Sequence, residues 1–103
     1  MVTRLLALIL LAAPAAAQEA TTTCAWLRLS PEAFEEGPCT VEWTADGARV
    51  AMGPRIWDIR ERERQGRWAA VTINGAPGMR FEIDRGTFSH ATADLNETLD
   101  VGP

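Results

Sequence analysis

The stretch that decides the fold is RIWDIRERERQGRW, residues 55–68, in which five arginines and three acidic residues alternate almost strictly. As a helix, this stretch would bring Ile56, Ile59 and Glu63 to one face, so it would have almost no apolar stripe to bury. As a hairpin with its loop at residues 64–66, it points Trp57 and Ile59 inward and offers a glycine where the loop needs positive φ. The stretch therefore predicts two antiparallel strands whose charged side chains face the solvent.

The preceding segment, CTVEWTADGARVAM at residues 39–52, also alternates with period two, and the pair Asp46 and Gly47 divides it. An Asp-Gly pair between two alternating runs is one of the strongest short-range hairpin signals. A two-residue turn at this pair opposes Trp43 to Val50. It leaves every large apolar side chain of the two strands on the inner face.

Two further turns follow along the chain. NGAPG, residues 74–78, predicts a five-residue loop that keeps Pro77 out of the hydrogen-bonded ladder. Another turn is expected around Arg85 and Gly86. The side chains that these two turns place inward are Met79, Phe81, Ile83, Phe88 and His90.

These patterns predict an all-β domain, a small antiparallel meander of seven or eight strands. So long a sheet in so small a domain curls into an up-and-down barrel or splits into a two-layer sandwich, because twist accumulates and free edges need cover. We expect the barrel.

One segment departs from the strand pattern. In SPEAFEEG, residues 30–37, Ser30 is suited to the N-cap of a helix, Pro31 to its first helical position and Gly37 to the residue that ends it. One short helix is therefore expected there.

The chain begins MVTRLLALILLAAPAAAQEA, which has the three-part layout of a secretory signal peptide with cleavage after Ala17. Its apolar run is too short to cross a membrane, so we expect no integral membrane span in the mature chain. The predicted organisation is a signal peptide over residues 1–17, a flexible N-terminus over residues 18–23 and a single β domain over residues 24–103. The absence of lysine is typical of GC-rich bacterial genomes, so the expected destination is the periplasm or the medium.

Cys24 and Cys39 are the only cysteines, and in an oxidising compartment they most simply pair with each other. Such a bridge encloses the predicted helix in a loop of about 15 residues and contributes on the order of 3 kcal/mol in the chain-entropy model. A zinc site or a reactive thiol pair would need closer spacing or histidine partners that the sequence lacks. We therefore expect neither a metal nor another cofactor.

Removal of the signal peptide leaves nine arginines against 14 acidic residues, a formal charge of −5. Because nucleic acids are bound largely through phosphate neutralisation, a nucleic acid is not an expected partner. The one histidine, His90, has Ser89 as its neighbour, and on a strand that serine points to the opposite face and cannot be its nucleophile. The sequence therefore predicts a protein that is not an enzyme.

Candidate binding residues gather on the outer face of the predicted sheet, where Arg60, Arg62 and Arg80 surround Trp68. Tryptophan and arginine are the residue types most enriched where interfaces concentrate their binding energy. The alternative is an indole packed under arginine stems in contact with water. The favoured hypothesis is an exported, non-enzymatic binding domain that recognises an envelope polymer or an extracellular protein through this face, with inhibition of a hydrolase as one use of such binding.

A second hypothesis is a small-ligand carrier with a pocket at the barrel mouth near His90. An eight-stranded barrel is often filled by its own side chains. The side chains predicted to point inward are bulky and make a ligand pocket less expected: Trp43, Trp57, Phe81 and Phe88. His90 is alternatively a buried, hydrogen-bonded group of the core. Two oligomeric states stay open, a monomer and a dimer that pairs through an uncovered sheet edge.

Overall fold

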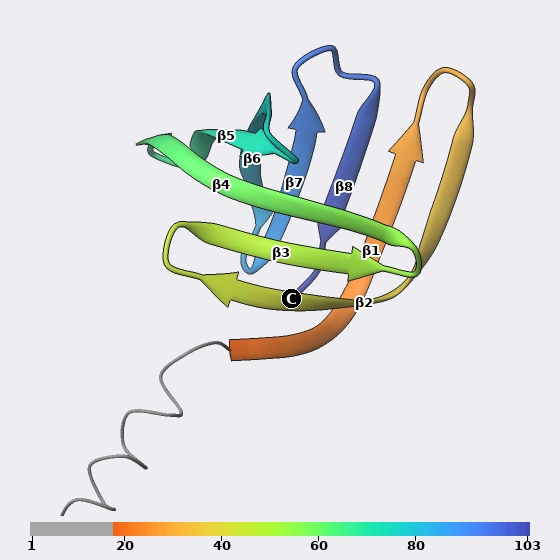
Figure 1. Ribbon diagram of the computed structural model, residues 1–103, viewed down its shortest axis with the longest axis horizontal. Coiled ribbons are helices and arrows are strands. Elements are labelled where there is room, and N and C mark those ends of the chain that lie inside the picture. Colours follow the sequence, from red (N-terminus) through yellow and green to blue (C-terminus); the bar gives the residue numbers. More distant parts are fainter. Residues whose placement is uncertain (1–17) are drawn as a thin grey trace, which may run out of the picture.

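The computed structural model describes residues 18–103 as eight antiparallel strands that follow one another in chain order and close into a barrel (Figure 1). The predicted signal peptide lies outside the described residues. The all-β prediction and the barrel are confirmed. The strands are β1 (Gln18–Arg28), β2 (Ala33–Thr44), β3 (Gly47–Met52), β4 (Arg55–Gln65), β5 (Trp68–Ile73), β6 (Ala76–Asp84), β7 (Thr87–Thr92) and β8 (Glu97–Val101).

Strand β1 closes the barrel. It pairs with β2 along its whole length and with β8 from Cys24 to Arg28. In Figure 1, β3 and β4 cross in front of β7 and β8, and β1 bends from one direction into the other. Residues 18–23, predicted as a flexible N-terminus, instead form the first half of β1. The first strand pairs with the last, although residues 18–23 of β1 and Ala33 to Cys39 of β2 pair with a neighbouring strand on one side only.

The predicted helix at residues 30–37 is wrong: the described residues contain no helix, and Ala33 to Gly37 belong to β2. These residues pair with Cys24 to Arg28 of β1, so sheet pairing overrides the local helix signals. Ser30 is a turn residue whose backbone N–H donates to Oδ1 of Asn96.

The predicted disulfide is confirmed between Cys24 and Cys39, whose Cα atoms are 5.8 Å apart on neighbouring strands. Both residues are buried. The bridge therefore ties β1 to β2 inside the core instead of closing a loop around a helix.

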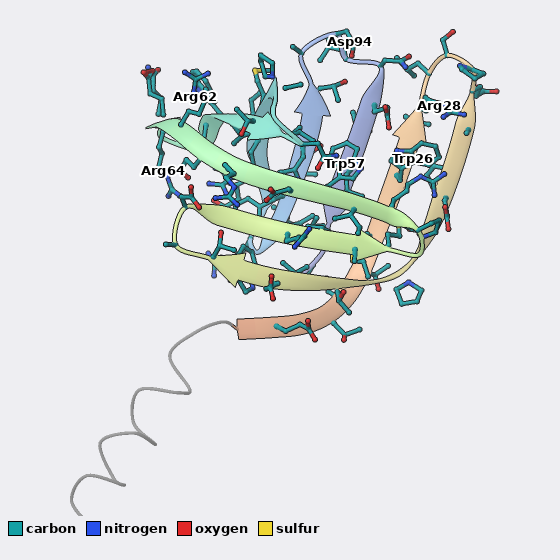
Figure 2. All side chains as sticks on the ribbon, in the orientation of Figure 1. Trp26, Arg28, Trp57, Arg62, Arg64 and Asp94 are labelled. Atoms are coloured by element: carbon teal, nitrogen blue, oxygen red, sulfur yellow. A yellow bond between two sulfur atoms is a disulfide. The ribbon has the colours of Figure 1, made fainter. Side chains whose placement is uncertain are left out.

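The core fills the barrel from the middle to one end. Trp57 and Ile59 are buried as predicted, and Figure 2 shows Trp57 in the region where β4 crosses β7 and β8. Trp26 is also buried, and its indole Nε1–H donates to Oε1 of Glu97. The guanidinium of Arg55 lies 3.6 Å from the centre of the Trp26 ring and forms an ion pair with the carboxylate of Glu35 on β2. A stacked cation and a buried indole thus close this end of the barrel.

The hairpin of β2 and β3 keeps its predicted faces but not its predicted partners. Val41 faces Val50, and Trp43 faces Ala48, two positions away from the predicted register. A shift by two leaves every side chain on its expected face. Trp43 nevertheless is not in the core: it lies at the end of β2 and is 44% exposed.

Candidate binding site at the open end of the barrel

The end of the barrel opposite Trp26 is open and holds a pocket of about 350 Å³, which we call the mouth. It lies where the β2–β3, β4–β5 and β6–β7 turns meet. The inward residues beside it on β3 and β5 are Ala48 and Ala69, which are too small to fill the interior. The mouth is lined by Trp43, Arg64, Gly66, Arg67, Trp68, Ala69, Arg80, Glu82 and Phe88.

A β-bulge in β4 turns Arg64 into the mouth. The register runs from Glu61 opposite Val71 to Glu63 opposite Ala70, so Arg62 is the extra residue of β4. Beyond the bulge, Arg64 faces the buried Ala69 and lies on the inner face. A bulge re-aims the side chains that follow it, and this one places a guanidinium at the barrel entrance.

A tight turn between β5 and β6 turns Arg80 inward, and here the sequence prediction is wrong. Asn74 and Gly75 have φ of 52° and 87° and form a two-residue turn, so that Ile73 faces Ala76 instead of Met79. The shift by an odd number of residues reverses both faces of β6. Two apolar side chains predicted inside are therefore exposed, Phe81 at 41% and Ile83 at 56%.

The side chain of Glu61 holds two of the mouth's arginines. Its Oε2 accepts hydrogen bonds from Nη2 of Arg64 at 2.8 Å and from Nη2 of Arg80 at 2.6 Å, while Nε of Arg64 lies 3.3 Å from Oε1. The hydrogen bond from Arg64 is the main reason why the pKa of Glu61 lies below its ordinary value. The same contact raises the pKa of Arg64. Glu61 is therefore an ionised counter-ion in the sheet wall.

The mouth carries a positive charge in an acidic protein. Three guanidiniums, those of Arg64, Arg67 and Arg80, face two carboxylates, those of Glu61 and Glu82, and leave a formal charge of +1. Within residues 18–103, no salt bridge joins Arg67 to a carboxylate. The guanidinium of Arg67 is thus the one least neutralised by the protein itself.

Aromatic rings form the walls of the mouth. Trp43 of β2 and Phe88 of β7 lie on the inner face, and the guanidinium carbon of Arg80 lies 5.4 Å from the centre of the Phe88 ring; Trp68 of β5 borders the mouth from the outward position next to Ala69. Trp68 is 37% exposed and pairs across the strands with Phe81. The mouth therefore combines flat apolar surfaces with cations, the combination that concentrates binding energy in interfaces.

His90 lies below the mouth, on the inner face as predicted, and is only 4% exposed. Its Nδ1 lies 3.1 Å from the carbonyl oxygen of Leu99, which can only accept, so Nδ1 carries the proton. Burial lowers the pKa of His90 to about 4. The recess between this ring and Trp43 has a volume of only about 10 Å³, roughly the space of one water molecule. His90 is therefore a neutral, hydrogen-bonded core residue at neutral pH.

The four predicted binding residues do not share one face. Arg60 is on the outside of β4, within 3.6 Å of a carboxylate oxygen of Asp46 and 3.5 Å of one of Asp58. Arg62 is the bulge residue and borders a separate outer hollow beside Gly78. Of these four, only Trp68 and Arg80 border the mouth, and Arg64 and Arg67, which the sequence analysis did not name, line it as well. Figure 2 shows Arg62 and Arg64 near the end of β4 that is remote from Trp26.

Other site types find no support in the part of the chain that the structure describes. No three histidine, cysteine, aspartate or glutamate side chains of residues 18–103 come together as metal ligands. Among the same residues, no helix is long and apolar enough to cross a membrane. No protein-family model, curated protein or solved structure matches the chain.

Proposed function

We propose that this protein is an exported, non-enzymatic binding domain that recognises an envelope or extracellular macromolecule through the mouth of its barrel. The observation that supports this most is the convergence of three arginines and the rings of Trp43 and Phe88 on one open pocket, bordered by Trp68, in a chain of net negative charge. Inhibition of a hydrolase is one consequence that such binding would have. Compared with the sequence hypothesis, the proposed contact moves from the sheet face around Arg60 to the barrel end around Arg67.

The depth of the mouth favours a large partner over an enclosed small molecule. Pockets for drug-sized ligands bury 70–90% of the ligand surface. Here the space below the mouth shrinks to about 10 Å³, because Val41, Val50 and His90 fill the interior. A ligand is held at the entrance only, which suits a group presented by a macromolecule.

The chemistry of the mouth favours binding over catalysis. Among residues 18–103, no serine, threonine, cysteine or histidine side chain lines it. Glu61 is kept ionised by two arginines, so its lowered pKa is the opposite of what a general acid needs. His90 already uses Nδ1 in a hydrogen bond to a backbone carbonyl. Nucleophile, base and cleft do not come together in this pocket.

Export to the periplasm or the medium is part of the proposal. A buried disulfide between β1 and β2 is typical of proteins that fold in an oxidising compartment. The apolar leader and the small residues that end at Ala17 agree with that route.

A small-ligand carrier is the second candidate, and the size of the mouth favours it. A pocket of about 350 Å³ is at the lower end of the range for small-molecule sites, about 300–1,000 Å³. In this version a small anion would bind at the arginines without a macromolecule. Capture of a macromolecule through the mouth distinguishes the two candidates.

The test is affinity capture from an envelope extract with the oxidised chain 18–103 immobilised. One variant, Arg67→Glu with Trp68→Ala, changes the mouth. A matched variant, Arg49→Glu with Ile56→Ala, makes the same two kinds of change at exposed positions of β3 and β4. Circular dichroism shows that each variant is folded. The proposal predicts a macromolecule retained by the native chain and the matched variant and lost from the mouth variant; identical captures by all three would refute it.

A further inference from the structure

We infer that the group received by the mouth is the carboxylate of an aspartate or glutamate side chain on a loop of a partner protein. This inference rests on the proposed function and adds the chemistry of the partner. It draws on the charge of the mouth, on the bonds that its arginines already make and on the apolar surface beside it.

Charge selects a single negative group. The four charged side chains that line the mouth, together with Glu61, which binds Arg64 and Arg80, leave +1, so one carboxylate neutralises it. A phosphate group carries about −1.5 to −2 at neutral pH and would leave an excess of negative charge next to Glu61 and Glu82. Such an excess is disfavoured because like charges held close together repel each other. A carboxylate is therefore the better match.

The arginines are already arranged for carboxylate recognition. Arg64 holds Glu61 through Nε and Nη2, the two-pronged geometry in which a guanidinium meets a carboxylate. That contact leaves Nη1 of Arg64 for a second acceptor. Arg67, which no salt bridge occupies within the described residues, comes from the adjoining turn. An incoming carboxylate would thus be bound by Arg67 and Arg64, with Arg80 held behind them by Glu61.

The surface beside the mouth favours a protein as the carrier of that carboxylate. Trp68 and Phe81 are cross-strand neighbours on the outside of β5 and β6, and Ile83 follows two residues later. Their exposed fractions are 37%, 41% and 56%. The rings alone could stack on a sugar, but the aliphatic Ile83 has no flat face to offer. A protein loop can cover all three with apolar side chains while its acidic residue enters the mouth.

The experiment uses tryptophan fluorescence, because two of the four tryptophans, Trp43 and Trp68, line the mouth and the other two are buried. The probe is the capped peptide Gly-Leu-Glu-Leu-Gly, with Gly-Leu-Gln-Leu-Gly as its neutral match. Inorganic phosphate and trigalacturonate represent the other anions. We expect saturable binding of the glutamate peptide that is about tenfold weaker, or more, for the glutamine peptide, as expected for loss of a charge-assisted contact.

Variants locate the effect on the chain. Arg67→Gln should weaken binding of the glutamate peptide about tenfold, and Arg49→Gln, the same change on the outer face of β3, should leave it unchanged. Equal binding of both peptides, no saturable binding of either, or tighter binding of phosphate or trigalacturonate would each overturn the inference. The proposed function would survive all of these results if the envelope capture still depended on the mouth. The proposed function would fail only if the envelope capture did not depend on the mouth, which is a different measurement from peptide binding.

Discussion

Acidification should unfold this protein largely through one buried side chain. Burial is the main cause that lowers the pKa of His90 from 6.5 to about 4, and the nearby charge of Arg80 acts in the same direction. Between pH 6.5 and 4 the unfolded chain therefore binds a proton on His90 that the folded chain does not, so stability falls as the pH falls. At 1.36 kcal/mol per pKa unit, this effect of His90 lowers the free energy of unfolding by about 3 kcal/mol between pH 7 and pH 4, and the His90 contribution levels off below that.

The assay is urea unfolding followed by tryptophan fluorescence at pH 7, 6, 5 and 4, with His90→Asn as the comparison. Asparagine keeps an amide donor for the Leu99 carbonyl but does not titrate. Glu61 and Asp94, whose pKa values are also lowered, lose stabilisation in acid in both proteins, so the difference between the two curves belongs to His90. Because the chain has a single histidine, NMR also follows its imidazole directly. An NMR midpoint near 6.5, or parallel stability curves, would refute the reasoning.

Three further predictions concern the barrel itself, each measured by urea unfolding. Replacing Cys24 and Cys39 with alanine should lower the free energy of unfolding by about 3 kcal/mol, as expected for a cross-link of 15 residues; no change would mean that the bridge adds nothing. Gly47→Ala should cost about 2 kcal/mol or more, since its Cβ would lie 1.9 Å from a carbonyl oxygen of β4, whereas Gly37→Ala, with open space around it, should change stability by less than about 0.5 kcal/mol. Arg60→Gln should also cost less than about 0.5 kcal/mol, because both its ion pairs are exposed, and a larger loss would contradict the solvated outer face.

Local patterns in the sequence were enough to predict the class of fold. Period-two alternation predicted the strands, and two cysteines behind a predicted signal peptide predicted the bridge. The strand signal comes from residues that are close together in the sequence. The disulfide signal needs only two cysteines and an oxidising compartment, so neither prediction required knowledge of which strands pair. The helix at residues 30–37 failed for the complementary reason. Its capping signals are real, but pairing of Ala33 to Gly37 with β1 outweighs them.

Register could not be predicted so well, because it depends on loop lengths that the pattern leaves open. Asn74 and Gly75 are a strong signal for a two-residue turn, but a five-residue loop was preferred because it kept Pro77 outside the ladder. In the structure Pro77 lies one residue before the pairing with β7 begins, so its missing N–H costs no bond there. That choice exchanged the predicted inner and outer faces of β6, so Arg80 was predicted on the outer face.

His90 was predicted inward through two errors that cancel. The wrong loop before β6 reversed that strand, and a further slip by one residue between β6 and β7 restored the face of β7. The bulge at Arg62 had no such compensation. Nothing in RERERQGR marks which residue is the extra one, so the alternation could not predict that Arg64 lines the mouth.

The most direct test of the central claim is site-specific photo-cross-linking in the cells that make the protein. A photoreactive phenylalanine analogue replaces Arg67 at the mouth in one variant and Arg49 on the outer face of β3 in the other. The account predicts a discrete cross-linked species from position 67 and none from position 49. A cross-link from position 49 alone, or none from either position in folded, exported protein, would contradict the barrel mouth as the binding site.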